Sequence, residues 1–204
     1  SAETIRDNAL AIGGLINSKM GGAAVRPYQP FGYYAPLNFP KRIYQADNNH
    51  DQYRRGVYIH WQRQFLHPML RAFDAPTREE CTAMRTVSNT PLGALTLMND
   101  PSYVEAAKGF ALRILYEGGD SQRERLIWAW QTALSRSPEK EELSVMIEYA
   151  ENIIKHYKKD RQASAKLLNI GNFKLPENIS MHDAAGWTNV ALALLNLSEV
   201  ITRN

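Results

Sequence analysis

The apolar residues of this chain recur mostly at spacings of three and four, the period of an amphipathic helix. The first such helix is predicted over residues 2–16, and the residues of its apolar face are Ile5, Ala9, Ile12 and Ile16. The glycine pair at 13 and 14 either weakens the last turn of this helix or allows a partner helix to approach closely. The most apolar helix is predicted after Ser180, with Asp183 as capping-box partner, and we expect it to lie in the core.

Capping residues mark the beginnings of several further helices. Thr90, Asp100 and Ser137 each precede a proline, which is favoured at the first helical position. Asp120 is expected to cap another helix, just after Gly118-Gly119 ends the preceding one. These signals predict helices that begin at about residues 91, 101, 121 and 138.

Two segments between these helices are less regular. Residues 17–52 contain four prolines and no helical period, which predicts a long arm that is either packed down by its aromatic residues or functional. Residues 54–65 carry apolar side chains on one helical face, so we expect a helix there, although partial alternation leaves a strand open. Thr77 and Glu80 form a capping-box pattern that predicts a short helix. Residues 160–179 are polar and show little pattern.

The predicted fold class is therefore all-α, an irregular helical domain of six or more helices with a long Pro-, Gly- and aromatic-rich arm. We expect one domain over residues 1–204, cut from the C-terminal part of a larger polypeptide. Its arm spans about 17–52, a motif-rich centre about 53–101, and the C-terminal helices about 101–204.

Composition narrows the functional classes. The 44% hydrophobic and 22% charged residues are typical of a folded protein, and the net charge of +3 comes from scattered basic residues, so no nucleic-acid partner is expected. The densest basic run, residues 155–161, is interpreted as a solvated helix end rather than a phosphate site. No apolar run predicts a membrane span. The single Cys81 excludes an intrachain disulfide and a Cys-x-x-Cys-His haem attachment within these residues, and we interpret it as a packed side chain.

Several spaced motifs resemble a known family, the domain of unknown function 1553. The motifs are residues 54–58 (RRGVY), 67–81 (HPMLRAFDAPTREEC), 85–95 (RTVSNTPLGAL) and 99–101 (NDP), and the likeness extends over almost the whole chain. Gly93 departs from the family, which more often has Gln there. The resemblance implies a C-terminal region of a large exported, planctomycete-type protein, often joined to a cytochrome c-like domain, and thus an extracytoplasmic location. It implies no activity.

One polar cluster is a candidate for chemistry. It consists of His67, Asp74, Arg78, Arg85 and Asn89. A histidine and an aspartate are what acid–base catalysis would use. The alternative is architectural, with Asp74 accepting backbone amides in a turn and pairing with Arg85.

The arm supplies a second candidate, an aromatic surface for sugar rings or flat ligands. Its residues are Tyr28, Phe31, Tyr33 and Tyr34. The alternative is that these rings only anchor the arm against the helices. Hydrolase, nucleotide and zinc motifs are absent, so we expect no cofactor and no metal, although His50-Asp51 and His182-Asp183 are weak metal candidates.

The leading functional hypothesis is a non-catalytic interaction or scaffold module that packs against upstream domains of the same polypeptide. The alternative is part of an extracytoplasmic enzyme, such as a carbohydrate-active hydrolase, whose site is completed by upstream domains. A deep polar pocket at His67 and Asp74 would favour the enzyme, and a broad exposed apolar patch would favour the module.

Overall fold

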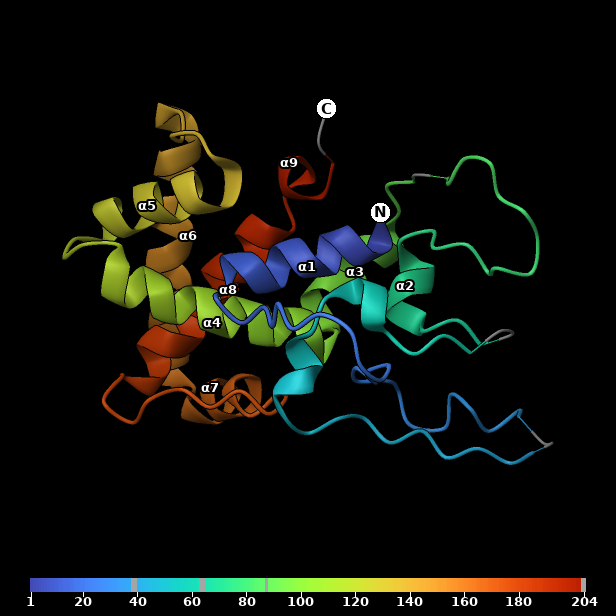
Figure 1. Ribbon diagram of the computed structural model, residues 1–204. Coiled ribbons are helices and arrows are strands. Elements are labelled where there is room, and N and C mark those ends of the chain that lie inside the picture. The colour runs from blue at the N-terminus through green and yellow to red at the C-terminus, as the bar shows by residue number, and fades with distance from the viewer. Residues whose placement is uncertain (38–39, 63–64, 87, 203–204) are drawn as a thin grey trace.

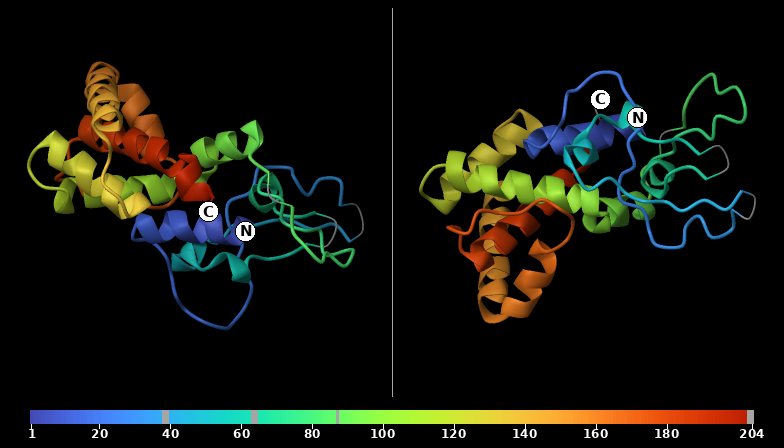
Figure 2. Two further views of the ribbon diagram at one scale, coloured as in Figure 1. Left: turned by 90° about the horizontal axis from the view of Figure 1, so that it is seen from above. Right: turned by 60° about the horizontal axis from the view of Figure 1, so that its bottom comes forward.

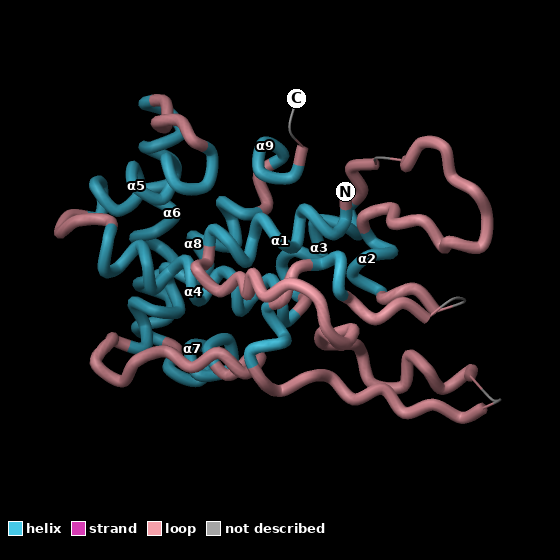
Figure 3. The backbone as a smooth tube through the Cα atoms, in the orientation of Figure 1, coloured by secondary structure: helices cyan, strands magenta, loops and turns pink. Residues whose placement is uncertain are grey.

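A computed structural model describes residues 1–37, 40–62, 65–86 and 88–202, and within these ranges the chain is all-α (Figure 1). The described residues form helices and loops without a strand, as Figure 3 shows, apart from three isolated β-bridges. The helices are α1 (Ala2–Ile12), α2 (Pro68–Ala72), α3 (Pro91–Asn99), α4 (Pro101–Glu117), α5 (Gln122–Leu134), α6 (Lys140–Lys159), α7 (Arg161–Leu168), α8 (Met181–Leu195) and α9 (Ser198–Ile201). Two short 3-10 helices, η1 (His50–Tyr53) and η2 (Gly56–Tyr58), lie between α1 and α2. The predicted fold class is confirmed.

Helices α4 and α8 form the centre of the core, where they pack extensively against each other (Figure 1). Phe110 and Ile114 of α4 and Trp187 and Leu194 of α8 are almost inaccessible to solvent. Burial of each such side chain stabilises the fold by about 1.5–3 kcal/mol. Helices α6 and α7 pack against α8, and α5 against both α4 and α6. The prediction that the last long helix lies in the core is confirmed.

Helix α1 crosses α4 at a contact between glycines. A Cβ atom at Gly13 would collide with the backbone of Ala106, and one at Gly109 would collide with the backbone of Gly13. The close helix approach expected from the Gly-Gly pair is therefore observed. The predicted end of α1 at residue 16 is wrong, because the helix stops at Ile12. The amides of Leu15 and Ile16 both turn back to donate to the Leu10 carbonyl.

Two of the four predicted helix starts, those at residues 91 and 101, are confirmed. Thr90 caps α3 through the Gly93 amide, and Asp100 caps α4 through the Ser102 amide at 2.8 Å. Helix α5 is instead capped by Ser121, which forms a reciprocal capping box with Glu124 rather than starting at Asp120.

The other starts shift because different side chains make the caps. Helix α6 begins at Lys140, two residues later than predicted, because Glu139 is its N-cap. Helix α8 begins after Ser180 as expected, but the Ser180 hydroxyl bonds the His182 ring and Asp183 forms no capping box with it. Helix α7 lies in the polar stretch 160–179, for which the pattern predicted no element, and Asp160 caps it by accepting the Ala163 amide.

Two buried arginines hold the arm against α1. Arg6 of α1 donates to the backbone carbonyls of Gln52 and Arg54, and Arg54 in turn donates to three carbonyls of the 19–23 segment. Of these bonds, the one from Arg6 to the Arg54 carbonyl occupies an acceptor that the first turn of a helix over residues 54–65 would need for itself. The predicted helix is therefore wrong, and the described residues of the segment form the turn η2 and extended chain.

The capping-box helix predicted at Thr77 is also wrong. Thr77 accepts the Glu79 amide, but Arg78 has a φ of 63°, which lies outside the helical region. The segment runs as an irregular loop after α2. It projects from the same end of the helical body as the arm and the residues before α2 (Figures 1 and 2).

Candidate functional site

The five residues of the predicted polar cluster do not share one site. Asp74 accepts hydrogen bonds from the Ser88 amide at 2.8 Å and from the Ser88 hydroxyl. Arg85 pairs instead with Glu3 of α1, at 2.8 Å. The predicted contact between Asp74 and Arg85 is therefore corrected to two separate contacts. Both are architectural in character, since the first joins two parts of the loop between α2 and α3 and the second ties that loop to α1.

The remaining exposed members of the cluster are also dispersed. The Arg78 guanidinium lies 3.7 Å from the centre of the Trp61 ring, a cation–π contact on the surface. Asn89 is exposed, one residue before the cap of α3. Cys81, which we expected to be packed, is exposed in the same loop.

His67 is buried at the start of α2 and has a different set of neighbours. Its ring packs 6.4 Å from that of Tyr44 and lies against the backbone of Pro27 and Tyr28. Burial lowers the pKa of His67 to about 4, and the nearby charge of Arg6 adds to the effect. The imidazole is therefore neutral at physiological pH, and Asp74 accepts its bonds from Ser88 rather than from this ring, so the two form no acid–base pair.

A second polar group, half-buried, lies where α1 meets the start of α4. Burial raises the pKa of Asp100 to about 6, although its bonds to Ser102 and the charge of Arg6 oppose the shift. The Tyr103 hydroxyl is buried there too, and burial followed by the charge of Asp100 holds its pKa well above the usual value. Sequence reasoning recognised Asp100 only as a cap, because its burial depends on segments distant in sequence.

Three of the four arm aromatics anchor the arm. The Tyr28 hydroxyl donates to Glu105 of α4, the Tyr33 hydroxyl donates to the Leu66 carbonyl at 2.8 Å, and Tyr34 is 8% exposed. Phe31 is fully exposed and packs on nothing. The anchoring interpretation therefore holds for the tyrosines.

Two of the anchored tyrosines, Tyr28 and Tyr33, form one wall of a groove of about 730 Å³. Its other walls come from α2, α3 and the start of α4, with Met69, Leu92 and Leu95 among the apolar side chains. Pro30, Pro68 and Pro101 line it as well, and their fixed rings favour a preformed shape. Because the hydroxyls of Tyr28 and Tyr33 are bonded to the framework, their rings are held in place as rigid apolar surface.

Few polar side chains enter this groove. They are Gln29, Arg71, Thr96, Asn99 and Asp100. Thr96 and Asn99 donate hydrogen bonds to carbonyls of their own helix, and these bonds do not tie them to another helix or loop. Among the described residues, no group of three or more His, Cys, Asp or Glu side chains is placed to hold a metal ion. The groove is thus chiefly an apolar binding surface with polar groups at its edges.

A family model described as PSD1, protein of unknown function (DUF1553), matches residues 1–150. The chain belongs to this family. The predicted resemblance is confirmed, and the matched part of this DUF1553 protein includes α1, the arm and every wall of the groove. No curated protein and no solved structure matches the chain. In the part that the structure describes, no helix has the length and hydrophobicity to cross a membrane.

Proposed function

We propose that this DUF1553 chain is a non-catalytic interaction module that docks against upstream domains of the same polypeptide. The observation that carries the proposal is the outer face of α3. Leu92, Leu95 and Met98 on this helix are 61%, 57% and 51% exposed. An apolar helix face of this kind costs free energy while it remains in water, and a protein partner would cover it.

The neighbouring groove extends this face into a larger surface. Leu92 and Leu95 contribute to both, so a partner that covers α3 also reaches the tyrosine wall of the arm. Interface cores combine aromatic and aliphatic side chains with a polar rim, and the groove has this composition. A preformed groove also lowers the entropic cost of binding.

The placement of ionisable residues supports the same function. His67 is buried and neutral, whereas Asp74 and Arg85 are engaged in separate surface contacts. Such residues stabilise loops and offer no joint site for proton transfer. The surface that remains free for a partner is the apolar one.

We infer the wider setting from family membership alone. As a DUF1553 protein, the chain would act in an exported, planctomycete-type polypeptide outside the cytoplasm, in some cases next to a cytochrome c-like domain. Fractionation of cells that produce the parent protein tests this inference, and recovery of the parent in the cytoplasm would contradict it.

The docking proposal is tested with a single charge on α3. The separately produced upstream region should bind the wild-type chain, and Leu95→Lys should weaken that binding by at least tenfold, since a lysine in an interface core is desolvated. Val145→Lys is the matched control, because Val145 is 65% exposed on α6, distant in sequence from the groove. Equal binding by wild type and Leu95→Lys would contradict the proposal.

The alternative function is a carbohydrate-active hydrolase, and one observation favours it. Asp100 lines the aromatic groove and has a pKa raised to about 6, a value that suits a general acid. Among the described residues that line the groove, however, Asp100 is the only carboxylate, and glycosidases usually use two. The upstream region would have to supply the second. Hydrolysis of a polysaccharide by the parent protein that is lost in Asp100→Asn would support this alternative over the module.

A further inference from the structure

A different pocket, which we call the anion pocket, lies at the base of the arm. Its lining residues are Arg26, Tyr34, Arg42, Ile43, Tyr44, His60 and Gln62, and its volume is about 310 Å³. It is separate from the α3 groove, with which it shares no lining residue.

A pair of extended segments positions two of its polar residues side by side. Val25 and Ile59 form a parallel β-bridge, in which the Val25 amide donates to the Tyr58 carbonyl and the His60 amide donates to the Val25 carbonyl. Val25 and Ile59 are buried, at 2% and 5% exposure. Because successive side chains in extended chain alternate in direction, Arg26 and His60 both turn away from the core on the same side.

The backbone of Arg26 is also held by Asp47, on the returning limb of the arm. Its amide donates to the Asp47 carboxylate at 2.7 Å, and its carbonyl accepts the Asp47 amide at 2.9 Å. The guanidinium is not used in any of these bonds. The main chain is therefore fixed while the charged end of the side chain remains available to a ligand.

Arg42 enters the pocket from the returning limb of the arm. Its guanidinium donates to the Gln62 side-chain oxygen at 2.9 Å, which places it against a residue that lines the pocket. In the described part of the chain, no carboxylate lies within ion-pair distance of the guanidinium of Arg26 or Arg42. Burial lowers the pKa of His60, and the charges of Arg26 and Arg42 lower it further, which agrees with convergence of the three side chains.

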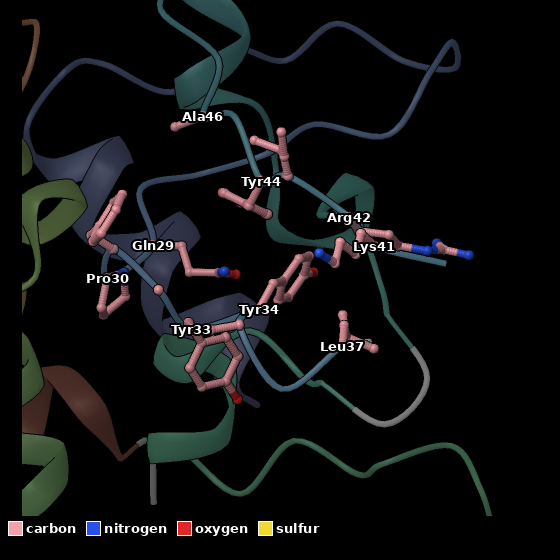
Figure 4. Close-up of a pocket in the computed structure, with 13 residues that line it drawn as sticks. Gln29, Pro30, Tyr33, Tyr34, Leu37, Lys41, Arg42, Tyr44 and Ala46 are labelled. Atoms are coloured by element: carbon pink, nitrogen blue, oxygen red, sulfur yellow. The ribbon is translucent and has the colours of Figure 1, made fainter. Parts of the chain in front are cut away.

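An aromatic wall adjoins this positive charge. Tyr34 and Tyr44 meet edge to face, with ring centres 5.3 Å apart, and line both the anion pocket and a second cavity of about 410 Å³. Figure 4 shows this second cavity between the two limbs of the arm, with Tyr33 and Tyr34 on one limb and Lys41, Arg42 and Tyr44 on the other. A charged head group in the anion pocket would thus lie next to room for a ring.

We propose that the anion pocket binds a small organic anion, whose carboxylate or phosphate group lies between Arg26, Arg42 and His60 and whose ring packs on Tyr34 and Tyr44. Guanidinium groups donate paired hydrogen bonds to both kinds of oxyanion, and an imidazole N–H adds a further donor. Two neighbouring guanidiniums without a carboxylate partner repel each other, and a bound anion relieves that repulsion.

Calorimetric titration of the whole chain at low ionic strength tests the proposal, with three probes. Glucuronate carries a carboxylate on a ring, glucose is its neutral counterpart, and inorganic phosphate is an oxyanion without a ring. We expect glucuronate or phosphate to bind and glucose not to bind, with affinity that decreases as salt is added. Tighter binding of glucuronate identifies a carboxylate ligand, and tighter binding of phosphate identifies a phosphate ligand.

Matched variants locate the binding. Arg26→Gln and Arg42→Gln should each reduce affinity by roughly tenfold or more, the effect of losing one charge-assisted hydrogen bond. Arg161→Gln, an exposed arginine on α7, should leave affinity unchanged. No binding of either anion, binding of glucose as tight as that of glucuronate, or an equal loss in Arg161→Gln would overturn the proposal.

Discussion

Glu105 and Lys108 lie one turn apart on α4, both fully buried, and together they hold the loop between α7 and α8. One carboxylate oxygen of Glu105 accepts the amides of Asn172 and Phe173 and the hydroxyl of Tyr53. The Lys108 ammonium donates to the carbonyl of Leu168 at the end of α7 and to the carbonyls of Ile170 and Phe173 in the loop. A loop without regular structure is thus tied to the core through two charged side chains.

Gly171, within this loop, should not tolerate a side chain. It has a φ of +74°, and a Cβ atom there would collide with the Glu105 carboxylate. Gly171→Ala should reduce the free energy of unfolding by about 2–4 kcal/mol, from left-handed strain plus overpacking. Gly21→Ala, with a similar φ of +71° and no atom within 4 Å, should cost only about 1 kcal/mol. Equal losses of the two variants in urea unfolding would contradict this account.

Lys108→Met should destabilise the protein strongly. The methionine retains most of the apolar stem but leaves the carbonyls of Leu168, Ile170 and Phe173 without their shared donor, and it removes a positive charge near Glu105. We expect a loss of about 3 kcal/mol, measured by urea unfolding. Lys158→Met, at an exposed site on α6, should change stability by less than about 0.5 kcal/mol. A stable Lys108→Met variant would show that the loop does not depend on this ammonium.

His67 and Asp100 should contribute opposite pH dependences to the free energy of unfolding. The folded pKa of His67 is about 4 against 6.5 for the free side chain, so the unfolded state binds more protons between these values and stability falls as pH falls. For Asp100 the folded pKa is about 6 against 3.8, so the folded state binds more protons and stability rises as pH falls.

The two contributions are separated by substitution. On acidification from about pH 7 to about pH 4.5, His67→Phe should lose less stability than wild type, and Asp100→Asn should lose more. Asparagine retains the oxygen that caps α4, so the helix start is preserved. Chemical unfolding at the two pH values provides the measurement, and identical pH dependence of both variants and wild type would refute the assignment.

Asp74 and Arg85 should act independently on stability. Asp74→Ala should cost about 1 kcal/mol, because Ser88 loses its acceptor, whereas Arg85→Ala breaks only an exposed ion pair and should cost less than about 0.5 kcal/mol. The double variant should show the sum of the two losses. A coupling energy above about 1 kcal/mol between the two substitutions would contradict this result and indicate the direct Asp74–Arg85 contact that the sequence predicts.

Local chemistry explains which parts of the fold were predictable. The starts of α3 and α4 depend on neighbouring residues, a cap followed by Pro91 or Pro101, and both were located correctly. The start of the 54–65 segment is held instead by Arg6, 48 positions away, which donates to the Arg54 carbonyl. Its apolar spacing was therefore misleading. Helix α7 is short and polar, so no apolar period marks it. Its cap, Asp160, lies within the charged run 155–161, where a capping residue does not stand out.

The candidate sites depend even more on tertiary structure. The α3 groove combines the arm with three helices, and only the aromatic residues of the arm were anticipated. The anion pocket brings together Arg26, Arg42 and His60, which share no motif: the bridge between Val25 and Ile59 places Arg26 beside His60, and the bond to Gln62 holds Arg42. Sequence spacing carries no information about such a bridge.

Hydrogen–deuterium exchange of the full-length parent protein, compared with the chain studied alone, tests the docking proposal most directly. If the outer face of α3 is an interface with upstream domains, amides of α3 and of the groove wall at residues 28–33 should exchange more slowly in the parent, while α6 around Val145 should be unaffected. Exchange in α3 that is identical in the parent and in the isolated chain would contradict the account.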